Sequence, residues 1–321
     1  MTAPNTAASS LEHRIGARGR FTLRQPAGEI AIRGVEGDVA RVRDLEDRPL
    51  TDSFEIVAAE GSLELRAIDR LGSLVGLLRR GPSPNLAVEV PHGAAVTIEA
   101  ASADVAASDL TGEKQIRTAS GAVSLVRLAG AVEVVTVSGE IEIDGQVQLE
   151  VLGRTVSGDL SLRLPATRRL DVGTTSGDLT VDAELQGEGP FEVRTISGDA
   201  TIVARGGLRI EAQTVTGDVD VASGSVVEST RGRKVVTIGR SGPTLTFRSV
   251  SGDLAVVKAT ETGAPATPPA ADASAGASAG AVAEPMTADD GRLAILRALE
   301  RGEISVSDAG QQLSELEEVA R

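Results

Sequence analysis

The chain has 321 residues and a formal net charge of -14, with 46 Asp and Glu against 32 Lys and Arg. An acidic chain repels nucleic acid and anionic lipid unless its basic residues gather in one patch, so we expect no nucleic-acid partner. Cys, Trp and Tyr are absent, and the two histidines are His13 and His92. Disulfides, thiolate metal sites and most general-base schemes are thereby excluded, and we expect neither an enzyme nor a cofactor.

The first 19 residues are polar and lack the apolar core of a secretory signal. No stretch of 18 apolar residues occurs in the rest of the sequence. We therefore expect residues 1–19 to be a disordered N-terminal tail and the protein to be cytoplasmic.

Residues 20–258 are predicted to form one all-β domain. Its opening strands contain the alternating segments 28–32, 37–42, 54–56 and 63–65, which we expect to cap the N-terminal end of the domain. The apolar segment Leu71–Arg80 is too short to span a bilayer. We interpret it as a lid over the end of the core, with a membrane-surface or partner contact as the less favoured alternative.

One phrase recurs along the domain: Thr-x-Ser-Gly-Asp, with some substitutions, followed by an apolar–polar–apolar triplet. Its glycines are Gly121, Gly139, Gly158, Gly177, Gly198, Gly217 and Gly252. They are separated by 18, 19, 19, 21, 19 and 35 residues, and we interpret the last gap as two coils, one of them degenerate between Gly232 and Gly242. A fixed period is the signature of stacked repeats, which predicts regular coils of about 19 residues from about residue 100.

Within each repeat the apolar residues alternate with period two. Counted through the phrase, this alternation predicts that Val156, Ile196 and Val215 point inward, with a corner near Arg194-Thr195. Stacked coils would bury one continuous core, so the predicted fold is all-β, a parallel β-solenoid. A β-propeller or a sandwich is the weaker alternative, because propeller blades need about 40 residues each and aromatic signatures.

The C-terminal part of the chain changes composition. Residues 259–286 are rich in Ala, Pro, Gly and Ser, which predicts a disordered linker. Residues 287–321 are predicted to form a small helical hairpin, which is shorter than the roughly 40 residues that usually fold alone. We therefore expect a protein partner or self-association through its apolar stripe. The stripe consists of Leu293, Leu296, Leu299, Val306, Leu313 and Leu316.

The iterated Thr-x-Ser-Gly-Asp phrase resembles the bacterial putative-adhesin family of β-strand-repeat proteins over roughly residues 20–258. Residues 293–309 are similar to the SHOCT-like helical hairpin that accompanies this domain in envelope-stress proteins, including daptomycin-sensing surface proteins. In those relatives the hairpin precedes the repeats, whereas here it follows them. The resemblance implies an all-β repeat domain of undefined biochemical function and a link to envelope stress.

The acidic residue of the phrase is predicted to point outward in every coil. The resulting ladder, spaced at about 4.8 Å, consists of Glu140, Asp159, Asp178, Asp199, Asp218 and Asp253. We interpret these residues as structural caps of their Ser-Gly turns. A neighbouring column is expected to screen their mutual repulsion of roughly 1 kcal/mol in water, and it holds Arg117, Arg154, Arg194 and Arg248.

Other interpretations of the ladder stay open. A cation- or ligand-binding face is the main alternative. An ice-binding threonine ladder fits poorly because charged residues interrupt it. A carbohydrate-active β-helix would use paired carboxylates, but it would need long loops and aromatic side chains.

These observations predict a non-enzymatic scaffold or protein-interaction module that presents a repetitive surface, with no catalytic, cofactor-binding or metal-binding residues. The alternative is a ligand- or membrane-sensing component of a bacterial envelope-stress response.

Overall fold

The computed structural model describes residues 5–7, 9–68, 83–221, 225–230, 233–239 and 242–259. The chain divides into two compact units, Met1–Glu261 and Thr262–Arg321, and the described residues all belong to the first. The segment Leu71–Arg80, the linker beyond Ala259 and the hairpin 287–321 with its apolar stripe lie outside the described residues. Their assignments stay predictions.

The described residues are almost entirely strand, so the all-β prediction is confirmed. The elements are β1 (Asn5–Ala7), β2 (Ser10–Arg14), β3 (Arg20–Val35), β4 (Val39–Asp44), α1 (Leu50–Ser53), β5 (Phe54–Ala59), β6 (Ser62–Ala67), β7 (Leu86–Pro91), β8 (Ala95–Ser108), β9 (Lys114–Ser120), β10 (Val123–Ser138), β11 (Ile141–Arg154), β12 (Leu160–Thr167), β13 (Arg169–Gly173), β14 (Leu179–Leu185), β15 (Phe191–Arg194), β16 (Ala200–Ala204), β17 (Leu208–Gln213), β18 (Val219–Val221), β19 (Val226–Thr230), β20 (Arg233–Ile238), β21 (Thr244–Arg248) and β22 (Leu254–Lys258). No helix among these residues has the length and apolar character needed to cross a bilayer.

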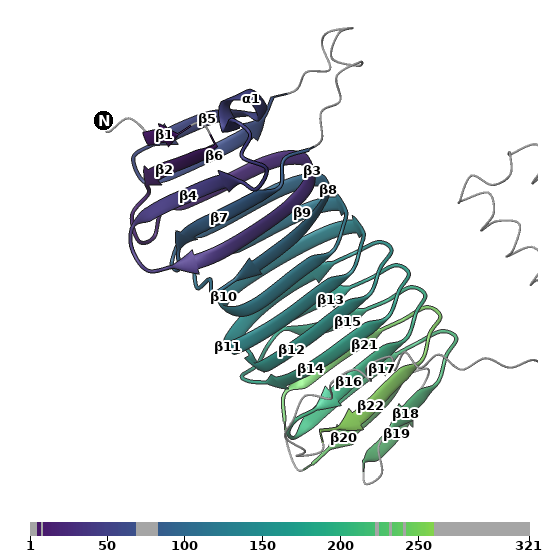
Figure 1. Ribbon diagram of the computed structural model, residues 1–321. Coiled ribbons are helices and arrows are strands. Elements are labelled where there is room, and N and C mark those ends of the chain that lie inside the picture. Colours follow the sequence, from purple (N-terminus) through teal and green to yellow (C-terminus); the bar gives the residue numbers. More distant parts are fainter. Residues whose placement is uncertain are drawn as a thin grey trace, which may run out of the picture. The chain divides into compact units, whose positions relative to one another are not determined.

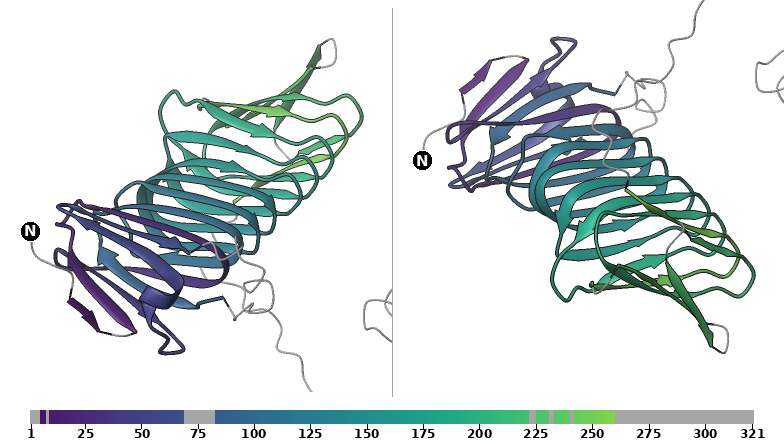
Figure 2. Two further views of the ribbon diagram at one scale, coloured as in Figure 1. Left: turned by 90° about the horizontal axis from the view of Figure 1, so that it is seen from above. Right: turned by 90° about the horizontal axis from the view of Figure 1, so that it is seen from below.

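The strands stack as coils, each with a first arm before the Thr-x-Ser-Gly-Asp corner and a second arm after it (Figure 1). In one coil, for example, β15 is the first arm and β16 is the second arm. Neighbouring coils pair in parallel, one repeat apart: Ile141 lies opposite Leu160, and Leu160 lies opposite Leu179. The two views of Figure 2 show the coils following one another from the N-terminal strands to the C-terminal ones.

Antiparallel strands close the N-terminal end of the stack. β2 pairs with β1 and β4, β4 pairs with β7, and β5 pairs with β6. The expectation of a disordered tail over residues 1–19 is therefore wrong for β2, where Leu11 is fully buried, and for Ile15 just after it, which is 2% exposed. A strand of five residues shows too little alternation to be recognised by its sequence alone.

The coils do not stack in chain order at the C-terminal end. β21 lies between β15 and β17, and β22 lies between β16 and β18. The coil formed by residues 244–258 is thus inserted between two coils that precede it in sequence. β19 pairs antiparallel with β20, and β20 runs antiparallel beside β17, so the predicted degenerate coil is wrong. Sequence period gives the spacing of coils but not their spatial order.

The corner turns later than the alternation predicts, because the inward series Phe191, Val193 and Thr195 continues past Arg194. Thr195 is 4% exposed and Ala200 is 1% exposed, whereas Ile196 between them is 51% exposed. The inward assignment of Val156, Ile196 and Val215 is therefore wrong. The strand ends at Arg194, and the phrase forms a turn in which period-two alternation does not apply. In the equivalent corner of another coil, the hydroxyl of Thr174 donates to the carbonyl oxygen of Ser176 at 3.1 Å, whereas the hydroxyl of Thr195 has no such partner.

Candidate binding surface

The corners of successive coils lie in register and form columns along one edge of the stack. The serine of each corner is bridged to the serine or threonine of the next, in parallel orientation, in the order Ser138, Ser157, Ser176, Ser197, Ser251 and Thr216. Every residue type of the phrase therefore repeats along this edge at the strand spacing of about 4.8 Å. Equivalent residues of the repeated phrase thus form parallel columns along this edge.

The glycine column makes this close stacking possible. Gly177 has a φ of +134°, which L side chains rarely adopt, and a Cβ there would lie 2.3 Å from the carbonyl oxygen of Gly158 in the next coil. Equivalent glycines meet the same obstacle, so glycine is needed for both the turn and the close approach of two backbones. The crowding comes from the backbone of the neighbouring corner.

The predicted acidic ladder lies beside the glycines. The side chain of Asp159 accepts a hydrogen bond from the backbone N–H of Asp178 at 2.8 Å, and the side chain of Asp178 accepts one from the N–H of Asp199 at 3.0 Å. The series continues from Asp199 to Asp253 at 2.8 Å and from Asp253 to Asp218 at 2.7 Å. Each of these four carboxylates thus caps the corner of the next coil, where the predicted cap would have lain within its own turn. Because backbone N–H groups stabilise negative charge, they offset the repulsion between neighbouring carboxylates.

The arginine column does not screen this ladder, which corrects the prediction. Arg154 pairs with Asp171 at 2.7 Å, and Arg117 pairs with Glu133 at 3.0 Å. Arg194 contacts Asp171 and Glu192. These carboxylates lie on the outer surface of the first arms, as the arginines do, whereas the acidic ladder begins the second arms. The two charged columns therefore lie on opposite sides of the corner.

Between the two charged columns, a row of exposed side chains, apolar except for Thr175, faces solvent. We call it the corner stripe; in stacking order it consists of Val137, Val156, Thr175, Ile196, Val250 and Val215. Val137, Val156, Ile196 and Val250 are 49–53% exposed, and Val215 is 79% exposed. The sequence feature that could have revealed this stripe is the variable position of Thr-x-Ser, which is Val or Ile in most repeats. It was missed because the alternation had assigned these residues to the core.

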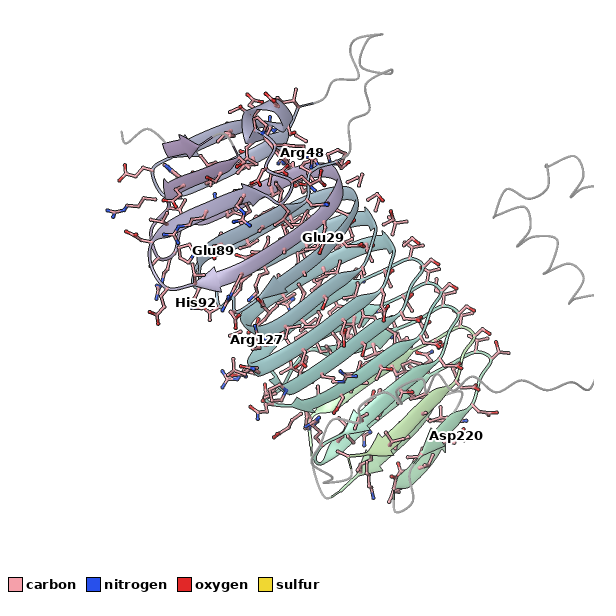
Figure 3. All side chains as sticks on the ribbon, in the orientation of Figure 1. Glu29, Arg48, Glu89, His92, Arg127 and Asp220 are labelled. Carbon is pink, nitrogen blue, oxygen red and sulfur yellow. The ribbon has the colours of Figure 1, made fainter. Side chains whose placement is uncertain are left out.

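The opposite edge of the stack carries ion pairs between neighbouring coils. Arg127, labelled in Figure 3, donates to both carboxylate oxygens of Asp109 at 2.7 Å. These hydrogen bonds lower the pKa of Asp109 to about 2. His92 contributes a ring nitrogen 2.6 Å from the carbonyl oxygen of Asp109. The arrangement ties three consecutive turns together, and every group in it already has a protein partner.

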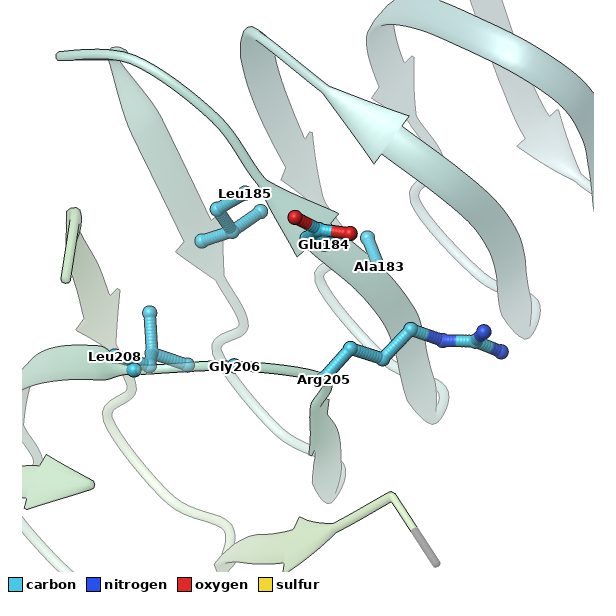
Figure 4. A pocket seen from close by; sticks show the side chains of 7 residues that line it. Ala183, Glu184, Leu185, Arg205, Gly206 and Leu208 are labelled. Carbon is cyan, nitrogen blue, oxygen red and sulfur yellow. The ribbon is translucent and has the colours of Figure 1, made fainter. Parts of the chain in front are cut away.

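The hollows of the described surface are small or shallow. One of about 90 Å³ lies between Ala183–Leu185 and Arg205–Leu208 (Figure 4). Another of about 300 Å³ lies on the outer face of β3, β7, β8 and β10, over small side chains such as Ala31 and Ala106. Small-molecule sites usually enclose roughly 300–1,000 Å³ and converge several polar groups on one point. Neither hollow gathers such groups.

The described residues contain no cluster of three or more carboxylate or imidazole side chains suited to hold a metal ion. The ladder has one carboxylate per coil, and most of these carboxylates already accept a backbone hydrogen bond. Its geometry is therefore that of a structural cap. The cation-binding alternative stays a prediction without support from this geometry.

Lys114, at the start of β9, is a buried ionisable group. Lys114 is 1% exposed, and its ammonium group donates to the carbonyl oxygen of Ala129. Burial disfavours the charged form and lowers the pKa of Lys114 from 10.5 to about 8. No carboxylate is bonded to this ammonium group among the hydrogen bonds of the described residues, so Lys114 reduces the stability of the fold at neutral pH.

Comparison with known proteins agrees with this architecture. A family model described as Toastrack DUF4097 matches residues 20–189 and 154–257. The chain therefore belongs to this family, which supports the resemblance to the putative adhesins. The SHOCT-like resemblance of residues 293–309 stays a prediction. Among curated proteins, no relative matches the sequence.

Several solved structures resemble the chain at low identity. A putative adhesin from Bacteroides fragilis is 10% identical, with 77% of this chain and 96% of that chain covered and a TM-score of 0.45. A putative cell adhesion protein from Clostridium sporogenes is 12% identical, with 80% and 100% covered and a TM-score of 0.26. A putative lipid binding protein from Parabacteroides distasonis is 11% identical, with 80% and 98% covered and a TM-score of 0.35.

Proposed function

We propose that the protein is a non-enzymatic interaction module, in which a β-solenoid of about 19-residue coils presents the corner stripe to a protein partner. The observation that carries this proposal is the exposure of Val137, Val156, Ile196, Val250 and Val215 at equivalent positions of neighbouring coils. Contiguous exposed apolar surface on a folded domain marks interaction sites, whereas apolar residues exposed singly need no explanation.

The charged columns support a binding role for this edge and not a catalytic one. Most ladder carboxylates already cap backbone N–H groups, and the arginines Arg117, Arg154 and Arg194 pair with carboxylates of the first arms. Such groups position a partner through their charge without needing to change their protonation state. The apolar row between them supplies the area whose removal from water stabilises a complex.

The C-terminal part of the chain extends this proposal. A linker over 259–286 and a SHOCT-like hairpin over 287–321 would give the solenoid a second, tethered contact, through which it binds a protein partner or self-associates. A cytoplasmic location belongs to the same proposal. The alternative function, sensing of a ligand or a membrane during envelope stress, rests on the segment Leu71–Arg80 and on the family resemblance.

The test is site-specific photo-cross-linking from the full chain in cells of the source organism. A photoreactive amino acid replaces Val156 in the corner stripe or, as the matched control, Val147, which is 52% exposed but lies outside the corners. We expect discrete cross-linked products from position 156 and none of the same products from position 147. Identical products from both positions, or none from position 156, would contradict the proposed function.

A further inference from the structure

The corner stripe has a length and a chemistry that limit its partner. Its six members occupy neighbouring coils, because backbone hydrogen bonds join each corner to the next. The N–H of Ser176, for example, donates to the carbonyl oxygen of Val156, and the N–H of Ser251 donates to that of Ile196. Five steps of about 4.8 Å give a row roughly 24 Å long. A partner must therefore offer a straight apolar row of similar length and repeat.

The two charged columns that flank the stripe have opposite sign. The arginine column lies two positions before it and contains Arg154, Arg194 and Arg248, which are aligned through Gly173. The acidic ladder lies three positions after it. A partner must offer negative charge on one side of its apolar row and positive charge on the other.

We propose that this partner is a second copy of the chain, which packs corner stripe against corner stripe with the two stacks parallel. The proposal rests on the proposed function and names the partner of the same surface. A second copy offers an apolar row with the same spacing, flanked by the same two charged columns. The match of spacing is automatic, since both rows have the repeat of a β-sheet.

Charge selects the orientation of the two copies. A two-fold axis parallel to the stacks places the acidic ladder of one copy opposite the arginine column of the other, on both sides of the apolar row. A two-fold axis perpendicular to the stacks places ladder against ladder and arginine against arginine. Like charges juxtaposed across an interface disfavour association, so the parallel arrangement is the one that the surface permits.

The interface is narrow, because a single row of side chains on each copy forms its centre. Stable interfaces usually bury about 800 Å² per partner. We therefore expect a dimer that dissociates at micromolar concentrations and weakens as salt rises, since the flanking charges are exposed.

The chain contains no Cys, so single cysteines report the orientation directly. Full-length Val137→Cys and Val215→Cys carry the thiol at the two ends of the stripe, and Val147→Cys is the control. In the parallel dimer each end meets its own equivalent, so both end variants form a disulfide with a second copy on mild oxidation. The control does not. In an antiparallel dimer neither end variant cross-links alone, but a mixture of the two does, and that result would overturn the proposal.

Sedimentation of the full chain supplies the second measurement. Replacing Val156 and Ile196 by serine is expected to weaken the dimer at least tenfold, while Val147→Ser leaves it unchanged and all variants keep the circular dichroism of the wild type. A chain that stays monomeric at 100 μM, or a dimer that the double variant does not weaken, would overturn the proposal. The proposed function would survive either result if position 156 still cross-linked to another protein in cells.

Discussion

The backbone N–H of Asp178 donates to the side chain of Asp159, 2.8 Å away in the neighbouring coil. This contact joins residues 19 positions apart in sequence and repeats with the next corner, where Asp199 donates to Asp178. It explains why the phrase ends in Asp: the carboxylate reaches the coil beside it, and the two corners are held in register. The acidic ladder is thus a consequence of stacking as well as a surface feature.

Removing one carboxylate should therefore weaken the stack, although removing only its charge should not. Asp178→Ala is expected to cost about 1 kcal/mol of unfolding free energy, because the N–H of Asp199 loses its acceptor. Asp178→Asn keeps an acceptor oxygen and relieves repulsion, so it is expected to be neutral or slightly stabilising. Denaturant unfolding measures the free energy of unfolding of both variants.

Millimolar calcium should leave the melting temperature of the wild type unchanged, and a rise of several degrees would contradict the structural role of the ladder.

The glycine column predicts a large effect from a single methyl group. Gly177→Ala is expected to cost about 2–4 kcal/mol, because its Cβ meets the carbonyl oxygen of Gly158 and the backbone conformation is unfavourable for alanine. The matched control is Gly206→Ala, whose Cβ meets no atom within 4 Å. If thermal melts show the same small loss for both variants, the close stacking of the corners is wrong.

Lys114 makes the stability of the fold depend on pH. Its pKa is lowered from 10.5 to about 8 by burial, so the unfolded chain binds more protons than the folded one between these values. The penalty of about 3 kcal/mol is fully present below pH 8 and disappears as the pH rises through 10.5. Lys114→Met should therefore be more stable than the wild type at pH 7, and the difference should shrink by pH 10.5. A constant difference across this range in denaturant titrations would argue against a buried, charged Lys114.

The inserted coil predicts an unusual response to truncation. Deletion of residues 260–321 leaves β21 and β22 in place and should leave the stability of the stack nearly unchanged. Deletion of residues 242–321 removes both strands and leaves β16 with β14 as a neighbour on one side but without β22 on the other. Hydrogen exchange in β16 is then expected to accelerate at least roughly tenfold. If both deletions show the same exchange in β16, the coils instead follow one another in chain order.

Much of this architecture could be predicted because stacking repeats a short pattern. The all-β class follows from the recurring phrase, whose spacing equals the offset between paired residues such as Leu160 and Leu179. The alternation of β16 could not be extended back through the phrase, since Gly198 with a φ of +130° turns the chain there. Thr195 instead continues the inward alternation of β15, and Ile196 points outward.

Pairings between strands that are distant in sequence could not be predicted for a different reason. Any coil with the same period fits any other, so nothing local distinguishes β22 from β18 as the neighbour of β16. The ladder residues were identifiable, but their acceptor role was not, because it depends on a backbone N–H of the next coil. The arginine partners were misassigned because the corner separates Arg194 from Asp199, whereas Glu192 lies on the same arm as Arg194 and pairs with it.

Thiol labelling along one corner tests directly whether the corner stripe faces solvent. Three single-cysteine variants of the cysteine-free chain, Thr195→Cys, Ile196→Cys and Ala200→Cys, are reacted with a thiol reagent under native conditions. We expect rapid labelling at position 196, close to the rate in denaturant, and strong protection at positions 195 and 200, which are 4% and 1% exposed. Protection at position 196 with rapid labelling at position 195 would contradict this expectation and place the stripe in the core.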